Sequence, residues 1–197
     1  MRSIKIITAI IASICVFASC SINDTKESQK PGSSGMTLEI LLVANENVYS
    51  GETKEFIDSL FKQPQENLNQ PEPIFNVVNI STALYNKSDL YKKHRNVIII
   101  DVNSKNENKV YFRRDEWSYP QVVFQFSISK ISELRPLLTK YFPQITDEIY
   151  NYERLRIKNT MNKLENTDIT RALKQNFGFW ITVSNEFQLS VLKDNFA

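Results

Sequence analysis

The chain contains very little cysteine, histidine and glycine, and each shortage excludes a class of site. Its two cysteines are Cys15 and Cys20. Beyond Cys20 there is therefore no cysteine nucleophile, no cysteine metal site and no disulfide. Four glycines, at positions 32, 35, 51 and 178, form no phosphate-binding or dinucleotide-binding motif. His94 is the only histidine, so a metal site would depend on carboxylates.

Charge is balanced once the first residues are set aside. The whole chain has 24 basic and 22 acidic residues, and residues 1–19 contain Arg2, Lys5 and no acid. The remainder is formally neutral, with 22 residues of each sign. Nucleic-acid-binding proteins normally have a basic footprint. We therefore expect no nucleic-acid partner and no electrostatic adhesion to anionic lipid.

The first twenty residues, MRSIKIITAIIASICVFASC, have the pattern of a lipoprotein signal peptide. After a positively charged start, residues 6–17 form an apolar run that is too short to cross a bilayer as a helix, which needs about 20 residues. We predict a signal peptide over residues 1–19 that is removed in front of Cys20, whose thiol is acylated with palmitate-type chains. The alternative is an ordinary secretory signal cleaved near Ala18, which leaves Cys20 free.

Residues 20–36 are predicted to be a flexible tether. They are polar, poor in large apolar side chains and interrupted by Pro31, Gly32 and Gly35. Several acyl chains hold a protein at a membrane almost permanently. Because no acidic run follows Cys20 to mark export to the surface, we expect a lipid-anchored protein of the cell envelope, in the outer membrane and facing the periplasm.

Short apolar runs predict a mixed β-sheet of about five strands within residues 38–129. LEILLVA (38–44) and NVIIIDV (96–102) are almost continuously apolar, which is typical of strands covered on both faces. QVVFQFSIS (121–129) alternates between apolar and polar residues and predicts a half-buried antiparallel strand. FNVVNIS (75–81) and VYFRRD (110–115) complete the set.

Helical spacing of apolar residues predicts two helices, over 51–63 and 131–165, that pack on this sheet. Pro143 lies inside the second, so we expect a long kinked helix there. A weaker, shorter helix is expected over 83–93. Together these elements predict the α+β fold class and one α+β domain over residues 37–166.

Residues 167–197 are predicted to form a helix followed by an incomplete hairpin. The helix is expected over 168–176 and is closed by Gly178. FWITV (179–183) and FQLSVL (187–192) have the composition of strands. The alternation continues almost to the last residue, so we interpret this part as the start of a second lobe in a longer chain.

Three stretches together resemble a known family. They are QPQENLNQPEPIFNVVNI (63–80), HRNVIIIDV (94–102) and DEWSYPQVVFQFS (115–127). In this order and spacing they are similar to lipoproteins of Bacteroides-type bacteria, catalogued as a domain of unknown function, number four-eight-three-seven. The resemblance covers most of residues 35–197 and implies a lipoprotein whose members are longer than this chain. It implies no activity, cofactor or catalytic residue.

His94 and Asp101 lie at opposite ends of one predicted strand. Seven extended residues span more than 20 Å, so Asp101 cannot orient His94 as the base of a hydrolase. His94 is better interpreted as a residue that bonds a neighbouring backbone group. Asp101 and Asn103 begin like a calcium loop, but Lys105 stands where a third oxygen ligand belongs, and a polar loop is the better interpretation.

Asp147, Glu148 and Glu153 lie on the long predicted helix. Hydrolysis by paired carboxylates would need two of them in a cleft. We interpret them as the solvated face of the helix, paired with neighbouring basic residues. The sequence therefore predicts no catalytic residue, no cofactor and no metal ligand.

The candidate partner surface consists of aromatic residues and a proline-rich segment. Tyrosine and tryptophan are favoured at interfaces, although packing is the commoner reason for such residues. The residues are Tyr111, Trp117, Tyr119, Pro71, Glu72 and Pro73. We expect a non-enzymatic envelope lipoprotein that binds a protein partner or a small ligand. The alternative is a periplasmic hydrolase that acts on glycan or peptide.

Overall fold

The computed structural model describes residues 30–66, 68–191 and 193. The predicted signal peptide and the predicted acylation site at Cys20 lie outside these residues. The description below concerns the compact unit that starts at Pro31. Within the described residues, no helix combines the length and the apolar character needed to cross a bilayer.

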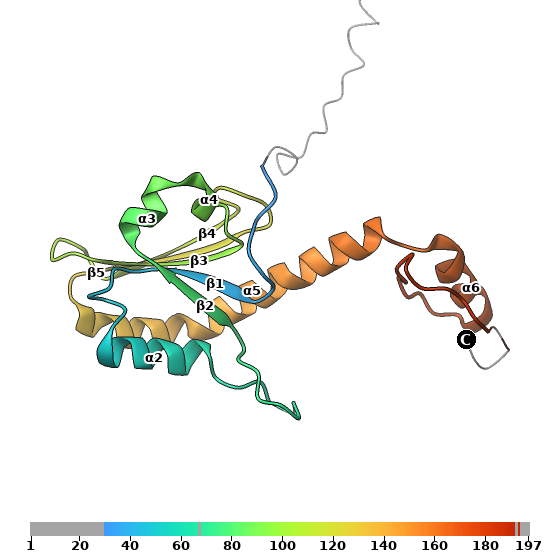
Figure 1. Cartoon of the computed structure of the whole chain (residues 1–197), viewed down its shortest axis with the longest axis horizontal. Coiled ribbons are helices and arrows are strands. Elements are labelled where there is room, and N and C mark those ends of the chain that lie inside the picture. Colours follow the sequence, from blue (N-terminus) through green and yellow to red (C-terminus); the bar gives the residue numbers. More distant parts are fainter. Residues whose placement is uncertain (1–29, 67, 192, 194–197) are drawn as a thin grey trace, which may run out of the picture. The chain divides into compact units, whose positions relative to one another are not determined.

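This compact unit is built on a five-stranded mixed sheet with the strand order β2-β1-β3-β5-β4 (Figure 1). Four strands run parallel to one another, and the fifth pairs with β5 in the antiparallel direction at one edge. Their bounds are β1 (Glu39–Val43), β2 (Asn76–Ile80), β3 (Asn96–Val102), β4 (Lys109–Arg114) and β5 (Val122–Ile128). The predicted α+β class and the mixed sheet of about five strands are confirmed.

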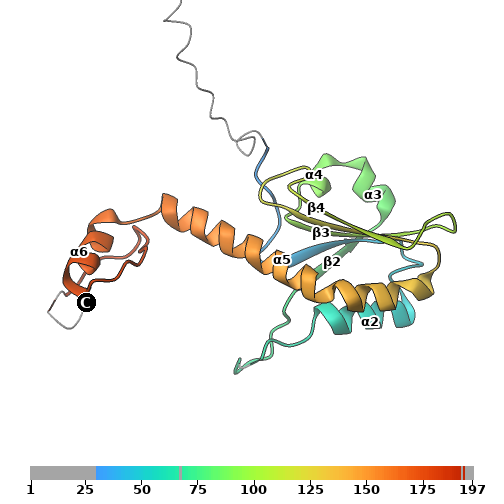
Figure 2. The same cartoon turned by 180° about the vertical axis from the view of Figure 1, so that it is seen from behind.

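Helices cover both faces of the sheet (Figures 1 and 2). On one face lie α2 (Gly51–Phe61) and α5 (Leu134–Lys163), and on the other lie α3 (Thr82–Lys87) and α4 (Asp89–Lys92). Side chains of a strand alternate between faces, so neighbouring residues enter different cores. Ile98 and Phe124 belong to the larger core under α2 and α5. Val97 and Val123 belong to the smaller core under α3 and α4.

The position of β5 corrects the interpretation of residues 121–129 as a half-buried antiparallel strand. β5 is an interior strand, parallel to β3 over its whole length and antiparallel to β4 alone. Val123, which breaks the alternation, is fully buried in the smaller core. Gln125 and Ser127 on the same face are only half-buried. The polar alternation therefore marks where one face of an interior strand is incompletely covered.

The helices begin and end close to the predicted residues. Pro64 follows the end of α2 at Phe61, and Ser81 and Ser88 cap α3 and α4 by accepting hydrogen bonds from main-chain amides. The expected helix over 83–93 is thus two short helices. The expected long helix begins with a 3₁₀ turn, η2 (Ile131–Glu133), and α5 then continues through Pro143 without ending.

The residues directly before β1 form an ordered strap, which corrects the predicted tether over its last part. In this N-terminal strap (residues 31–36), the Ser34 amide donates to the Lys93 carbonyl at 2.9 Å. The Arg95 amide in turn donates to the Ser34 carbonyl at 2.9 Å, and the Tyr119 amide to the Pro31 carbonyl at 2.9 Å. The strap therefore belongs to the same compact unit as the sheet, whereas the domain was expected to start at residue 37.

The C-terminal residues contain one helix, α6 (Thr167–Phe177). Its first turn is capped by the Asn166 side chain, and Gly178 ends it with a left-handed backbone, φ +74°. The two expected strands over 179–183 and 187–192 are not formed in the part of them that the structure describes. One isolated bridge joins Glu165 and Ser184 instead. Its hydrogen bonds run from the Asn166 amide to the Val183 carbonyl and from the Asn185 amide to the Leu164 carbonyl, so a single bridge stands where a strand ladder was expected.

Candidate functional site: a crevice at the carboxyl edge of the sheet

The strand order reverses between the neighbours β1 and β3. The chain leaves β1 through α2 toward β2 on one side, and it leaves β3 toward β4 and β5 on the other. In open α/β sheets, ligands bind outside the carboxyl ends of the strands at such a reversal point. This geometry makes the carboxyl ends of β1 and β3 the first place to expect a ligand.

A crevice of about 360 Å³ lies at this point. Four polar side chains line it, from the loop after β1, the start of α3 and the end of β3: Asn45, Asn47, Thr82 and Asp101. Its apolar walls include Val48, Ile100 and Ile131. Apolar walls with a few convergent polar groups are the usual composition of a small-molecule site.

Part of this polar set is already fixed by hydrogen bonds. Asn45 Oδ1 accepts from the Thr82 amide at 3.1 Å and so joins the loop after β1 to the start of α3. Asp101 Oδ2 accepts from Asn106 Nδ2 at 3.1 Å. Within the described residues, the Asn47 side chain and the Thr82 hydroxyl have no hydrogen-bond partner. In the crevice, side chains that are already hydrogen-bonded therefore lie beside side chains that can still bond a ligand.

The charge of the crevice is low. Asp101 is its one carboxylate, and no lysine or arginine belongs to its lining. The Asn103–Lys105 turn beside it binds its own backbone, because Asn103 Oδ1 accepts from the Lys105 amide at 3.0 Å. No group of three or more potential metal ligands occurs in the described part of the chain. The lining thus favours a neutral ligand with hydroxyl or amide groups.

His94 lies at the opposite, amino edge of the sheet and is held from three sides. Nδ1 lies 3.0 Å from the Asn96 carbonyl, as expected for a residue that bonds a neighbouring backbone group. Nε2 lies 2.8 Å from Glu39 Oε1, and Gly35 of the N-terminal strap packs on the ring. Both ring nitrogens face protein oxygens and the residue is buried, so His94 has no open position for a substrate.

The hydrogen bond to His94 changes the acidity of Glu39. Burial alone raises the pKa of this carboxyl group. The hydrogen bonds from His94 and from the Met36 amide outweigh burial and hold the pKa below its ordinary value. Glu39 is therefore a charged partner that orients His94, and sequence reasoning did not identify it because 55 residues separate the two.

Glu153 corrects the interpretation of the acids on the long helix as a solvated face. It is 4% exposed, and its two oxygens accept from Arg95 Nη1 and Arg156 Nη1, each at 3.0 Å. The neighbouring Glu148 is half-buried and binds Arg114, whereas Asp147 is exposed. The three acids do not meet in one cleft, so they do not form a carboxylate pair.

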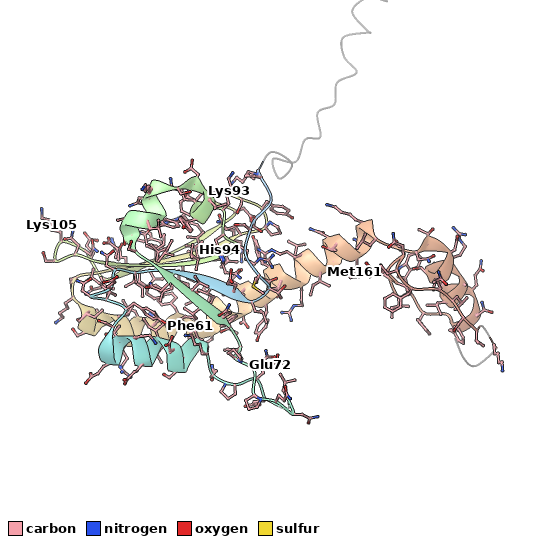
Figure 3. All side chains as sticks on the ribbon, in the orientation of Figure 1. Phe61, Glu72, Lys93, His94, Lys105 and Met161 are labelled. Atoms are coloured by element: carbon pink, nitrogen blue, oxygen red, sulfur yellow. The ribbon has the colours of Figure 1, made fainter. Side chains whose placement is uncertain are left out.

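The candidate partner residues lie in different surroundings. Tyr111 is exposed on β4, but Trp117 packs edge-on against Tyr85 with ring centroids 6.1 Å apart, in the smaller core. Tyr119 is half-buried against the N-terminal strap. Pro71, Glu72 and Pro73 are exposed on the loop between α2 and β2, where Figure 3 shows Glu72 extending away from the sheet. These residues do not form one continuous face.

Sequence reasoning did not identify Asn45, Asn47 and Thr82 as site residues. A usable signal exists, because Asn45 and Asn47 directly follow an apolar strand and Thr82 follows the next one. The carboxyl ends of parallel strands lie at one edge of a sheet. What the pattern did not supply was the parallel direction of β1 and β2.

The comparisons with known proteins identify a family but no function. A family described as "Domain of unknown function (DUF8532)" matches residues 33–162. Its number differs from that of the family which the sequence resembles, and this corrects the earlier identification. No curated protein and no solved structure matches the chain.

Proposed function

Because the chain belongs to the family described as Domain of unknown function (DUF8532), which brings no activity, we propose a function from the geometry of the domain. We propose that the protein is a binding module held at a membrane by acylated Cys20. Its crevice binds a small neutral ligand that is rich in hydroxyl groups. A sugar residue is the ligand class that fits best. The carrying observation is the crevice between β1 and β3, lined by Asn45, Asn47, Thr82 and Asp101.

The hydrogen-bonding groups of the crevice support this ligand class. An asparagine amide both donates and accepts, a threonine hydroxyl does the same, and a carboxylate accepts only. This mixture matches sugar hydroxyls, each of which also donates and accepts. An anionic ligand would meet Asp101 without any cation in the lining, and that arrangement is unfavourable.

The position of the N-terminal strap supports the membrane tether. The chain enters the sheet at its amino edge, where Ser34 pairs with His94. The crevice lies at the other end of β3, whose seven residues span about 23 Å in an extended strand. A protein held through residues before the strap would keep the crevice accessible. The envelope location and the lipoprotein part of the family resemblance belong to this proposal.

The rival hydrolase is less well supported by the same geometry. His94 is enclosed by Glu39, Asn96 and Gly35 at the far edge of the sheet. Within the lining of the crevice, Asp101 is the one titratable group, whereas glycoside hydrolysis generally uses two carboxylates. The available groups suit binding and orientation of a ligand.

The test measures ligand binding by the purified protein, with N-acetylglucosamine and its disaccharide as probes that carry both hydroxyl and amide groups. We expect shifts in the NMR signals of Asn47 and Thr82, and weakening of binding by at least tenfold in Asn47→Ala and Asp101→Asn. Asn86→Ala is the matched control, because Asn86 is exposed on α3 and outside the crevice.

Two outcomes would contradict the proposal. If neither probe nor a wider panel of neutral saccharides shifts these signals, the ligand class is wrong. If a chromogenic glycoside or a peptide is hydrolysed and Asp101→Asn abolishes the turnover, the hydrolase interpretation replaces the binding module.

A further inference from the structure

A second hollow lies at the amino edge of the sheet, distinct from the crevice. It is an open groove of about 460 Å³ between the N-terminal strap, the Tyr119-Pro120 turn and the second half of α5. Figure 3 labels Met161, which lines its outer part on α5. The charged side chains of its lining are Arg95, Arg156, Lys163 and Glu153.

The lining of the groove is short of negative charge. The lining contains three cations and one carboxylate, Glu153. Both oxygens of Glu153 already accept hydrogen bonds from the two arginines. Two further carboxylates lie nearby outside the lining, but Glu39 is bound to His94, and Asp115 accepts from the Gln121 amide and the Tyr152 hydroxyl.

Arg95 retains unused hydrogen-bonding capacity. Its Nη1 binds Glu153, whereas its Nε and Nη2 have no partner among the described residues. Arg156 is more fully used, since it donates to Glu153, Ser33 Oγ and the Pro120 carbonyl. Burial lowers the pKa of Arg156 despite the opposing effect of Glu153. An anion in the groove would stabilise both guanidinium groups.

The arrangement along α5 extends the positive charge outward. Lys163 follows Arg156 by seven residues, which brings it to the same side of the helix about 10 Å further along. Ser33, Thr37 and Thr160 add hydroxyl groups to the lining. Guanidinium, ammonium and hydroxyl donors together are the groups that bind tetrahedral oxyanions.

We propose that this groove binds a phosphate group, with Arg95 at its inner end and Lys163 at its outer end. The phosphate belongs either to a free phosphorylated metabolite or to a lipid headgroup. Both have the same chemistry, and the groove adjoins the strap through which the chain enters the domain. This site is independent of the sugar-binding crevice.

The test uses the Cys20→Ser protein, which has no thiol to acylate, so that binding to vesicles does not depend on an acyl chain. Calorimetric titration with inorganic phosphate and glycerol 1-phosphate measures free phosphates. Co-sedimentation with phosphatidylglycerol vesicles, against phosphatidylcholine vesicles, measures headgroups. We expect saturable binding of at least one phosphate source, and binding to phosphatidylglycerol vesicles alone identifies the headgroup.

Three variants locate the binding. Arg95→Gln should weaken it at least tenfold and Lys163→Gln about threefold. Arg154→Gln is the matched control on α5, because Arg154 is exposed, bonds Asn151 and lies outside the groove. Lys163 is exposed at the end of the helix, so its variant reports on binding even if Arg95→Gln does not fold.

The proposal is overturned if all phosphate sources fail to bind. It is also overturned if Lys163→Gln and a folded Arg95→Gln bind as tightly as the parent protein. Asp101→Asn, at the crevice, should leave phosphate binding unchanged. Failure of one site is thereby distinguished from failure of the other.

Discussion

Gly35 and His94 are packed so closely that no side chain fits between them. A β-carbon on Gly35 would lie 2.3 Å from Nε2 of His94, and the Gly35 backbone has φ +99°, which other residues rarely adopt. The same ring is held by Glu39 and by the Asn96 carbonyl. The His94 ring therefore contacts the N-terminal strap, β1 and β3 at once, in addition to the strap's own backbone hydrogen bonds.

Gly35→Ala should lower the free energy of unfolding by about 2 kcal/mol or more, because the methyl group displaces the His94 ring and strains the backbone. Urea denaturation at pH 7 measures this change. Gly32→Ala is the matched control in the same strap, since a β-carbon there meets nothing within 4 Å. Equal stability of the two variants would show that the strap does not pack on His94.

Glu153→Gln should lower the free energy of unfolding by about 3 kcal/mol, since it leaves two largely buried guanidinium groups without their shared carboxylate. The side chains of Arg95 and Arg156 are 16% and 12% exposed. Glu107→Gln removes the exposed ion pair with Lys109 and should leave urea denaturation unchanged. If Glu153→Gln and Glu107→Gln unfold at the same urea concentration, the buried ion pairs of Glu153 do not stabilise the fold.

Asp58 should make the protein less stable in acid. Burial raises the pKa of this carboxyl group, but hydrogen bonds from Lys54, Tyr49 and Lys62 outweigh burial and lower it to about 2. A pKa lower in the folded than in the unfolded state stabilises the protein fully above the unfolded value. That stabilisation is lost as the pH falls from about 4 toward 2.

The measurement for Asp58 is the difference in unfolding free energy between the parent protein and Asp58→Asn, followed from pH 7 to pH 2. We expect about 1 kcal/mol at pH 7 and a decline toward zero below pH 3. Asp147→Asn, at an exposed acid, serves as the control. A difference that is constant with pH would show that Asp58 is not held by its three partners.

Cys20→Ser should release the protein from membranes. Without a thiol the acyl chains cannot be attached, and the neutral remainder of the chain supplies little electrostatic attraction to a bilayer. Labelling with an alkyne analogue of palmitate, followed by membrane fractionation, tests both steps. A parent protein that incorporates no label, or a Cys20→Ser protein that still incorporates it, would contradict the lipoprotein prediction.

The strands and the long helices were predictable because burial on two faces leaves a simple pattern. β1 and β3 are nearly all apolar, because their successive residues enter the two cores alternately. The partners of β5 were not predictable, since Gln125 and Ser127 give an interior strand the alternation of an edge strand. The strap was missed for a related reason: its serines and glycines bind through backbone groups, which leave no mark in a sequence.

The polar sites were less predictable than the fold. Glu153 has the composition of a surface residue on a helix, and its burial depends on Arg95, 58 positions away. Predicting the crevice would have required the direction of each strand as well as its position in the sequence. Long-range pairings such as that of Glu39 with His94 depend on the order of strands, which short patterns do not encode.

The strand order also determines when the domain can be completed during synthesis. β5 lies between β3 and β4 although it follows both in the chain. The edge of β3 that pairs with β5 therefore has no partner until residues 122–128 have left the ribosome. The apolar residues 97–100 are exposed on an open strand edge until then, the condition that promotes aggregation. Release of a chain that stops before Val122 would therefore yield an insoluble product rather than a smaller folded domain.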